Sequence, residues 1–231
     1  MTSIVSAQDL RRVYGEGGAA VTALDGVSVD FPAGAFTAIM GPSGSGKSTL
    51  MHLLAGLDRP TSGTVTLDGV ELTALDDDDL TELRRDRVGF VFQAFNLLPV
   101  LDARENIVLP MSIAGRKPDQ EWVDRLIDTV GLRDRLTHRP SELSGGQQQR
   151  VAVVRALASR PAVVFADEPT GNLDSHASTE ILQLLRRSVD EFGQTIVMVT
   201  HDEDAAAYAD RLLVLRDGQI VEDRAPTPAG V

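Results

Sequence analysis

The sequence predicts an α/β fold with a parallel sheet as its core, a small antiparallel sheet beside it and an inserted helical segment. Short apolar runs at 163–167, 195–200 and 211–215 alternate with stretches of helical periodicity, which is the pattern of parallel βαβ construction. Residues 27–31 and 64–68 alternate apolar and polar side chains and adjoin turn sequences, so they predict strands of the antiparallel sheet.

The inserted segment, residues 94–142, is predicted to be mostly helical. Apolar side chains recur there at the spacing of one helix face, and the set is Trp122, Val123, Leu126, Ile127 and Val130.

The 231 residues are expected to form a single domain, because no Pro/Gly/Ser-rich linker and no internal repeat divides them. The core and the antiparallel sheet should occupy about 1–93 and 161–223, and the helical subdomain about 94–160. A loose tail is expected at 224–231.

A glycine-rich loop follows the apolar run 36–40 and precedes residues with helix-like apolar spacing. It fits G-x-x-x-x-G-K-[ST] in the strand-loop-helix setting of P-loop NTPases, which predicts a RecA-like core. The glycines let successive N–H groups converge on a polyanion together with the positive end of the helix dipole. Lys47 should reach the β- and γ-phosphates of ATP and Ser48 a Mg²⁺ ion. The predicted ATP-binding residues here are Gly41, Pro42, Ser43, Gly44, Ser45, Gly46, Lys47, Ser48 and Thr49.

Two adjacent carboxylates stand at the end of the apolar run 163–166. Asp167 should lie at the carboxyl end of a buried parallel strand, where open α/β sheets bind ligands, and can hold Mg²⁺ through water. Glu168 should point in a different direction, which leaves it available to polarise an attacking water as general base. Pro169 then ends the strand.

A second phosphate cradle is indicated at Ser144, Gly145 and Gly146, which open another predicted helix. This stretch, 143–150, contains no lysine. It therefore forms only half of a phosphate site, and a half-site implies a partner copy.

Taken together, these motifs resemble the ABC ATPase family across essentially the whole chain. The resemblance implies a head-to-tail dimer in which each of two ATP molecules lies between the glycine loop of one copy and Ser144, Gly145 and Gly146 of the other. The motifs, in chain order, are the phosphate loop 41–48, Gln93, the signature 143–147, Asp167-Glu168, Gly171-Asn172-Leu173-Asp174 and His201.

The resemblance gives further roles to single residues. Tyr14 matches the aromatic residue that stacks on adenine. Gln93 matches a residue that contacts Mg²⁺ or the attacking water, and His201 matches a residue that contacts the γ-phosphate. Gln147 belongs to the signature, and Asp174 to a loop that crosses the dimer interface. The residues expected in catalysis are thus Lys47, Gln93, Glu168 and His201, and those expected at the metal are Ser48, Gln93 and Asp167.

Plainer interpretations stand beside three of these roles. Tyr14 fits a strand-edge tyrosine, and Gln93 an exposed loop amide. Asp174 fits the N-cap of a helix that starts at residue 175, a role that is compatible with the interface role.

Composition narrows the class of partner. The net charge of −12 disfavours nucleic acid, because an acidic protein is repelled by the phosphate backbone. The absence of cysteine excludes disulfides and fits a reducing compartment. We find no signal peptide and no run of roughly 20 apolar residues that would span a membrane. The acidic run 76–79 is interpreted as the start of a helix and not as a metal cluster.

Residues 95–99 and 167–174 resemble the branch that includes lipoprotein-release, macrolide-export and cell-division ABC ATPases. This implies a cytoplasmic protein, peripheral on the cytoplasmic face of the membrane, that works with a separate permease. The permease is expected to dock near Gln93 and on the apolar patch of residues 95–100, although the patch also fits simple packing of the helical arm. Its apolar residues are Phe95, Leu97, Leu98, Pro99 and Val100.

The alternative is a soluble ABC ATPase that acts on the ribosome or on nucleic acid. Such a protein would be expected to have two ATPase halves, a basic surface or coiled-coil insertions, and the sequence contains none of these. A small-molecule kinase would share the glycine loop but would leave the stretch 143–150 without a role.

Overall fold

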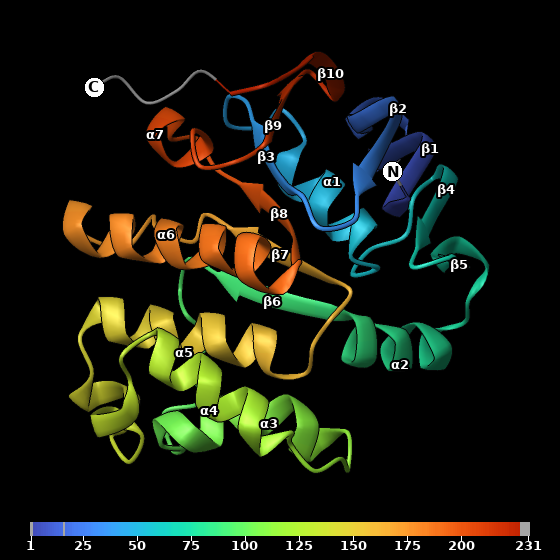
Figure 1. The fold of residues 1–231 in the computed structure, drawn as a ribbon. Coiled ribbons are helices and arrows are strands. Elements are labelled where there is room, and N and C mark those ends of the chain that lie inside the picture. The colour runs from blue at the N-terminus through green and yellow to red at the C-terminus, as the bar shows by residue number, and fades with distance from the viewer. Residues whose placement is uncertain (1, 16, 227–231) are drawn as a thin grey trace.

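The computed structural model describes residues 2–15 and 17–226, and it confirms the predicted α/β fold with two sheets (Figure 1). The larger sheet has the strand order β10-β9-β3-β8-β7-β6. Its strands are parallel except for the antiparallel pair β9–β10. They are β3 (Phe36–Met40), β6 (Val88–Phe92), β7 (Val163–Asp167), β8 (Thr195–Val199), β9 (Arg211–Arg216) and β10 (Gln219–Arg224).

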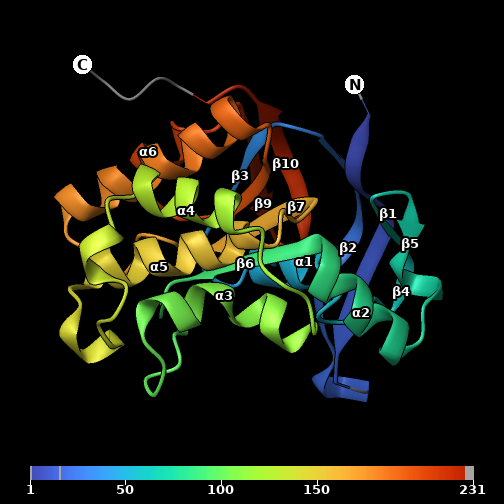
Figure 2. The ribbon, with the colours of Figure 1, turned by 60° about the horizontal axis from the view of Figure 1, so that its bottom comes forward.

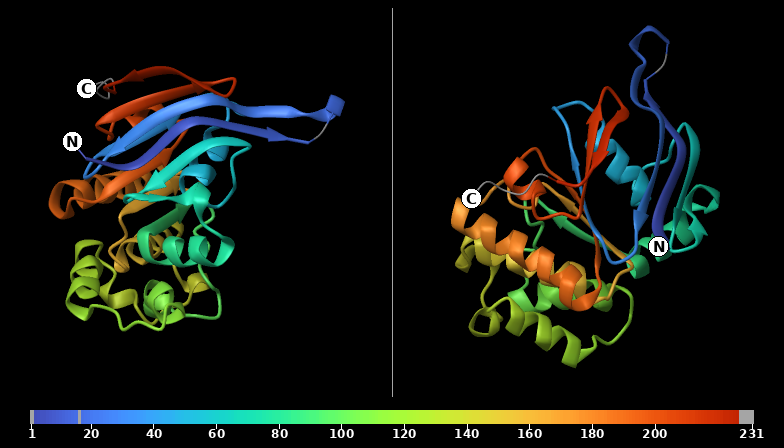
Figure 3. Two further views of the ribbon diagram at one scale, coloured as in Figure 1. Left: turned by 90° about the vertical axis from the view of Figure 1, so that its right-hand side faces the viewer. Right: turned by 45° about the horizontal axis from the view of Figure 1, so that its top comes forward.

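The smaller sheet is antiparallel, in the order β2-β1-β4-β5. Its strands are β1 (Ser3–Tyr14), β2 (Val21–Pro32), β4 (Ser62–Leu67) and β5 (Val70–Glu71). The predicted segments 27–31 and 64–68 fall in β2 and β4, and β1 lies between them. The β1–β2 hairpin projects well beyond the rest of the molecule (Figure 3).

Seven α-helices and four 3-10 turns complete the described part of the chain. Helices α3 to α5 gather at one end of the molecule, away from the antiparallel sheet (Figure 1). The α-helices are α1 (Lys47–Leu54), α2 (Asp77–Arg87), α3 (Ala103–Ile113), α4 (Gln120–Thr129), α5 (Gly145–Ala158), α6 (Ser175–Phe192) and α7 (Glu203–Ala206). The 3-10 turns are Gly17–Ala19, Leu72–Ala74, Arg133–Arg135 and Pro140–Glu142.

The large sheet separates two hydrophobic clusters, because successive side chains of a strand point to opposite faces. Along β7, Val163 and Phe165 pack into the cluster with α1 and the antiparallel sheet. Val164 and Ala166 pack into the cluster with the helices α3 to α6. This two-sided burial explains why the strand is a continuous apolar run.

Two helix predictions are confirmed at the level of single residues. The apolar stripe in the inserted segment forms the buried face of α4, where Trp122 Nε1 donates to Leu157 O at 3.1 Å. The acidic run begins α2, and Asp76 accepts from the backbone N–H of Asp79 at 2.9 Å as its N-cap. These carboxylates therefore stabilise a helix start.

The end of the chain differs from the expectation of a tail at 224–231. Arg224 is the last residue of β10, because its backbone pairs with Leu212 of β9. Residues 227–231 lie outside the described part. None of the helices in the described residues combines the length and the apolar character that a membrane span requires.

Candidate active site

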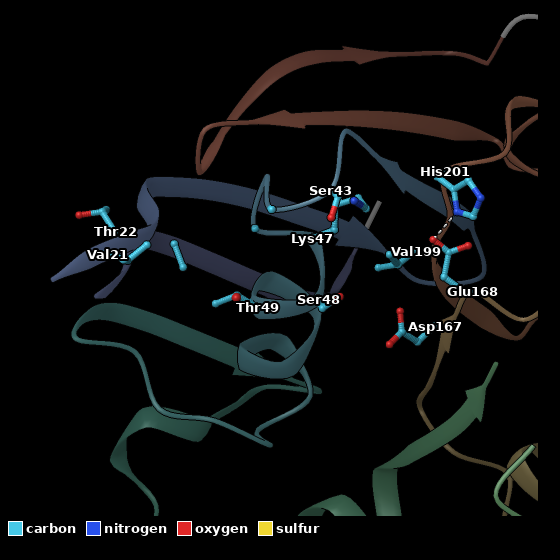
Figure 4. A pocket seen from close by; sticks show the side chains of 13 residues that line it. Val21, Thr22, Ser43, Lys47, Ser48, Thr49, Asp167, Glu168, Val199 and His201 are labelled. Carbon is cyan, nitrogen blue, oxygen red and sulfur yellow. Dashed lines mark hydrogen bonds and ion pairs between the residues drawn. The ribbon is translucent and has the colours of Figure 1, made fainter. Parts of the chain in front are cut away.

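A pocket of about 440 Å³ opens at the carboxyl ends of β3, β7 and β8. The side chains of the glycine loop and of the two later strands face one another across it (Figure 4). Most of the lining was predicted from the sequence. The lining residues are Val21, Thr22, Ala23, Ser43, Gly44, Gly46, Lys47, Ser48, Thr49, Asp167, Glu168, Val199 and His201.

In the loop between β3 and α1, Gly41 and Gly46 stand at positions where a side chain does not fit. Gly41 has φ +149°, and a Cβ there would lie 2.1 Å from Leu215 O. Gly46 has φ +102°, and its Cβ would lie 2.5 Å from Ala23 O. Any side chain at these positions would move the loop away from β9 or β2, because the left-handed region and the close backbone both exclude it.

The start of α1 is open to an anion. Among the α-helices of the described residues, α1 alone has no side-chain cap. Lys47 Nζ donates to Gly41 O and Pro42 O, both at 2.9 Å, and Ser45 Oγ is buried without a hydrogen-bond partner. First-turn N–H groups, an ammonium and a buried hydroxyl on one loop fit a polyphosphate.

Glu168 and His201 form a hydrogen-bonded pair at the edge of the pocket, with Oε1 2.8 Å from Nδ1 (Figure 4). The hydrogen bond raises the pKa of His201 above its ordinary value, and the negative charge of Glu168 adds to this. Glu168 has φ +47° and donates its N–H to Val199 O at 2.9 Å. This uncommon backbone conformation turns its side chain out of the strand direction that Asp167 follows.

Asp167 is the last residue of β7 and lies between Phe92 and Val199 of the neighbouring strands. Burial raises its pKa and the nearby Glu168 adds to this, whereas the electrostatic interactions with His52 and Lys47 act in the opposite direction. A cation in the pocket would stabilise the ionised carboxylate. Asp167 thus has the chemistry expected of a metal-site residue.

Gln93 follows β6 at the same edge of the sheet but is not among the residues that line the pocket. Its Nε2 donates to Asn172 Oδ1 at 3.1 Å, and Asn172 Nδ2 donates to Gln93 O at 3.0 Å. The sequence placed Asn172 in a motif but did not identify this pairing. In this conformation the Gln93 amide is held by a neighbouring loop.

Tyr14 also lies outside the pocket lining, at the end of β1. It pairs in register with Val21 of β2, which does line the pocket. Arg12 stacks on the ring at 4.5 Å from its centroid, and the Tyr14 hydroxyl donates to Asp58 Oδ2 at 2.8 Å. Both contacts hold the ring in one orientation.

Sequence reasoning did not name four of the lining residues, which are Val199 of β8 and the β2 residues Val21, Thr22 and Ala23. The β2 residues carry no motif, and their only signal is the register that pairs Tyr14 with Val21. That register can be read only when the pairing of β1 with β2 is known.

The signature lies elsewhere on the chain. Ser144 caps α5, since its Oγ accepts from Gln147 N at 3.3 Å and its N–H donates to Gln147 Oε1 at 2.9 Å. None of Ser144, Gly145, Gly146 and Gln147 lines the pocket. They adjoin the start of α6, where a Cβ on Gly146 would lie 3.1 Å from Ala177 Cβ.

Asp174 caps that neighbouring helix and accepts from Ala177 N at 2.8 Å. The N-cap interpretation is therefore confirmed, and Asp174 lies beside the signature. The two helix starts together form a surface that is separate from the chain's own pocket.

Comparison with known proteins identifies the family. The model of a family described as "ABC transporter" matches residues 24–171. The chain belongs to this family.

Relatives of this chain have names that refer to macrolide export or lipoprotein release. A macrolide export ATP-binding/permease protein, MacB of Marinobacter nauticus, is 49% identical over 95% of this chain and 34% of its own length. The chain thus spans about a third of that relative. The lipoprotein-releasing system ATP-binding protein LolD 1 of Chlorobium chlorochromatii is 49% identical over 88% of this chain and 84% of its own length. These relatives do not favour the ribosome or nucleic-acid alternative.

Solved structures of one relative have the same fold. A dimeric post-hydrolysis state of the ATP-binding cassette MJ0796, bound to ADP and Pi, superposes with a TM-score of 0.86 and 41% identity over 97% of this chain and 100% of that one. The uncharacterised MJ0796 protein is from Methanocaldococcus jannaschii. As an ABC-type P-loop NTPase, this chain has the fold predicted from its phosphate loop, and membership of the family implies ATP hydrolysis.

Proposed function

We propose that the chain binds and hydrolyses ATP as one of two identical copies in a head-to-tail dimer, and that the dimer drives a separate membrane permease. One observation carries this proposal. The pocket brings together the phosphate loop, Glu168 and His201, whereas the Ser144 helix start lies on another surface. A phosphate site made from both surfaces requires a second copy, and MJ0796 cassettes are dimeric in their structures.

In the proposed site the triphosphate lies on the open start of α1. Lys47 Nζ leaves Gly41 O and Pro42 O and binds the β- and γ-phosphates instead. Adenine stacks on the ring of Tyr14. Ser48 and Asp167 would hold Mg²⁺, and the Gln93 amide, which is bonded to Asn172 in this structure, would be a further group near the ion. When bound, Mg²⁺ neutralises charge that develops on the transferred phosphoryl group.

Glu168 acts as the general base in this proposal. Its carboxylate accepts a proton from the attacking water, and the hydrogen bond to His201 fixes its orientation. His201 can also donate to the γ-phosphate, because a protonated imidazole has two N–H donors. Ser144 and Gly146 of the second copy close the site.

The permease is proposed to dock beside Gln93, on the cytoplasmic face of the membrane. Within the expected patch 95–100, Leu98 and Val100 are exposed, whereas Phe95 and Leu97 are half-buried and Leu97 packs on the core. An apolar groove adjoins this patch, and Asn96 lines it. In this proposal the permease, and not this chain, determines which class of substrate is handled.

The test is a pull-down with tagged Glu168→Gln protein from detergent-solubilised membranes in ATP and Mg²⁺. We expect a stoichiometric membrane protein to co-purify. The control is the double variant with Lys47→Ala, which should retain far less of it if nucleotide binding drives assembly. Recovery of soluble partners alone, such as ribosomes, would contradict the proposal.

A further inference from the structure

One glutamine of α5 is fully buried beside the large sheet. Gln149 has no exposed surface, although the signature at the start of the same helix reaches the surface. Helix α5 lies directly against β6 (Figure 2), where a Cβ on Gly89 would lie 2.5 Å from Ala156 O. This close approach lets a side chain of α5 reach the backbone at the ends of the strands.

The Gln149 amide joins the ends of two neighbouring strands. Its Nε2 donates to Phe92 O, at 3.3 Å, and to Pro169 O. Phe92 is the last residue of β6, and Pro169 follows β7 by two positions. An amide nitrogen has two N–H groups, one for each of these carbonyls. Gln149 therefore connects the two strand ends that lead into Gln93 and Glu168.

The oxygen of the same amide is an unpaired group. Gln149 Oε1 is buried and has no hydrogen-bond partner among the described residues. Turning the amide over would place this oxygen against two carbonyl oxygens, which also cannot donate to it. A methionine would fill a similar space without an unsatisfied acceptor, so packing by itself does not account for a glutamine here.

Pro169 belongs to the turn that sets the direction of the Glu168 side chain. Glu168 has φ of +47°, an uncommon conformation that persists only where the surrounding structure holds it. Its N–H donates to Val199 O at 2.9 Å, and its carbonyl accepts from Gly171 N at 3.0 Å. Gln149 holds the next residue of this turn from the side of α5.

The loop after β6 packs against the same turn. A Cβ on Gly171 would lie 2.7 Å from Gln93 Nε2, and the Gln93 amide is bonded to Asn172. Further along α5, Arg155 donates to Phe95 O at 2.9 Å. Helix α5 is therefore a common support for the loops that follow β6 and β7.

We propose that Gln149 is a positioning residue for Glu168. Its two hydrogen bonds fix the turn after β7 to the end of β6, so that the Glu168 carboxylate faces the attacking water. The inference rests on the proposed function, in which Glu168 is the general base. It gives a residue outside the nucleotide pocket a role in the rate of hydrolysis and none in ATP binding.

The test replaces Gln149 by methionine, which has a similar length and no donor. Gln149→Met should lower the rate of single-turnover ATP hydrolysis about 10- to 100-fold, because a small displacement of a catalytic group has an effect of this size. ATP affinity should stay within about twofold of the wild type, since only the chemical step is affected. An unchanged rate, or an equal loss of rate and affinity, would overturn the inference.

Gln194→Met is the matched control. Gln194 Nε2 also donates to two carbonyls, Pro161 O and Thr195 O, both at 3.2 Å. These carbonyls lie at the amino ends of β7 and β8, the opposite edge of the sheet from the active site. The change removes similar bonds and should keep the hydrolysis rate within about twofold of the wild type, because distant sites act independently. An equal loss of rate in the two variants would contradict a specific role of Gln149.

Combination with Glu168→Gln separates a role through Glu168 from a general disturbance. Adding Gln149→Met to Glu168→Gln should change the remaining rate by less than about twofold, because the group that Gln149 positions is already lost. A further loss of about tenfold would overturn the inference while the proposed function stands. If Glu168→Gln alone hydrolyses ATP at the wild-type rate, the proposed base is wrong and the inference fails with it.

Gln149→Glu tests the same bonds in a side chain of unchanged shape, and it serves where the methionine variant does not fold. A protonated carboxyl keeps one donor for the two carbonyls, whereas an ionised carboxylate keeps none. Burial raises the pKa of such a carboxyl well above its usual range. The hydrolysis rate of Gln149→Glu relative to the wild type should therefore fall between about pH 6 and about pH 9. A ratio that stays constant over this range would overturn the inference.

Discussion

The starts of α1 and α5 are both glycine-rich and differ in how their N–H groups are satisfied. At α1 no side chain caps the helix, and Gly46 and Lys47 line the pocket. At α5 Ser144 and Gln147 form a reciprocal capping box outside it. A helix start needs partners for its first N–H groups. The α1 start thus has no side-chain acceptor of its own and can take an anion, whereas at α5 the Ser144 hydroxyl already accepts from the backbone N–H of Gln147.

This difference explains how one chain can contain two unequal halves of a phosphate site. The α1 half has a lysine, a carboxylate at a strand end and a base, so it should bind nucleotide alone. The α5 half has a neutral hydroxyl and glycines, so it should contribute only when a second copy brings phosphate to it. The four predictions below separate these halves.

The largest effect is expected at Glu168. Glu168→Gln should lower the rate of ATP hydrolysis about 10²- to 10⁴-fold, because a general base is lost, and should preserve ATP binding at the α1 half. Single-turnover hydrolysis and equilibrium binding of labelled ATP measure the two separately. Hydrolysis at the wild-type rate would show that Glu168 is not the base.

Next in size is Lys47→Ala, which should weaken ATP binding roughly 10- to 100-fold. Hydrogen bonds to charged groups contribute about 1.5–3 kcal/mol, which corresponds to that change in affinity. Lys117→Ala, at the only other lysine in the sequence, is the control and should leave affinity unchanged. Equal affinity of both variants in a fluorescence titration would contradict an open anion site at α1.

A smaller change in stability is expected at the α5 half. Ser144→Ala and Ser144→Arg should each cost about 1 kcal/mol of unfolding free energy, because both remove the N-cap oxygen. Only the arginine should also block the ATP-dependent dimer by its size, while each single subunit still binds ATP. Light scattering in ATP with Glu168→Gln proteins measures this, and a persistent dimer with Ser144→Arg would contradict the half-site interpretation.

The smallest effect concerns pH and the His201–Glu168 pair beside the α1 half. Since the folded pKa of His201 is raised above about 6.5, the pair adds stability below that pH and loses it as pH rises through the folded pKa. The gain is small because His201 is exposed. NMR titration should give a lower His201 pKa in Glu168→Gln than in the wild type, and identical values would exclude the pair.

Much of the pocket could be predicted from the sequence because its residues sit at the ends of parallel strands. The apolar runs before Asp167 and His201 identify strands, and parallel strands end at one edge of a sheet. The glycine loop adds Lys47 and Ser48 through a motif that requires its own strand and helix. Local pattern and chain direction together were sufficient for these residues.

Other parts of the site depend on contacts between distant segments. Val21 reaches the pocket through its register with Tyr14, and Gln93 is held by Asn172, 79 positions away. Arg84 and Arg85 of α2 meet Arg155 of α5 at one apolar groove, and Arg155 donates to Phe95 O across 60 positions. No periodicity or motif encodes such pairings.

The sequence by itself determined the two helix starts, the strand ends and hence the family, because each depends on a few neighbouring residues with fixed backbone requirements. Only the tertiary structure decided which of these share a pocket, that Ser144 pairs with Gln147 away from that pocket, and that arginines of α2 and α5 line one groove of an acidic chain. The reason is physical: helix and strand geometry act over a few residues, whereas burial and charge compensation depend on segments that meet only when the chain folds.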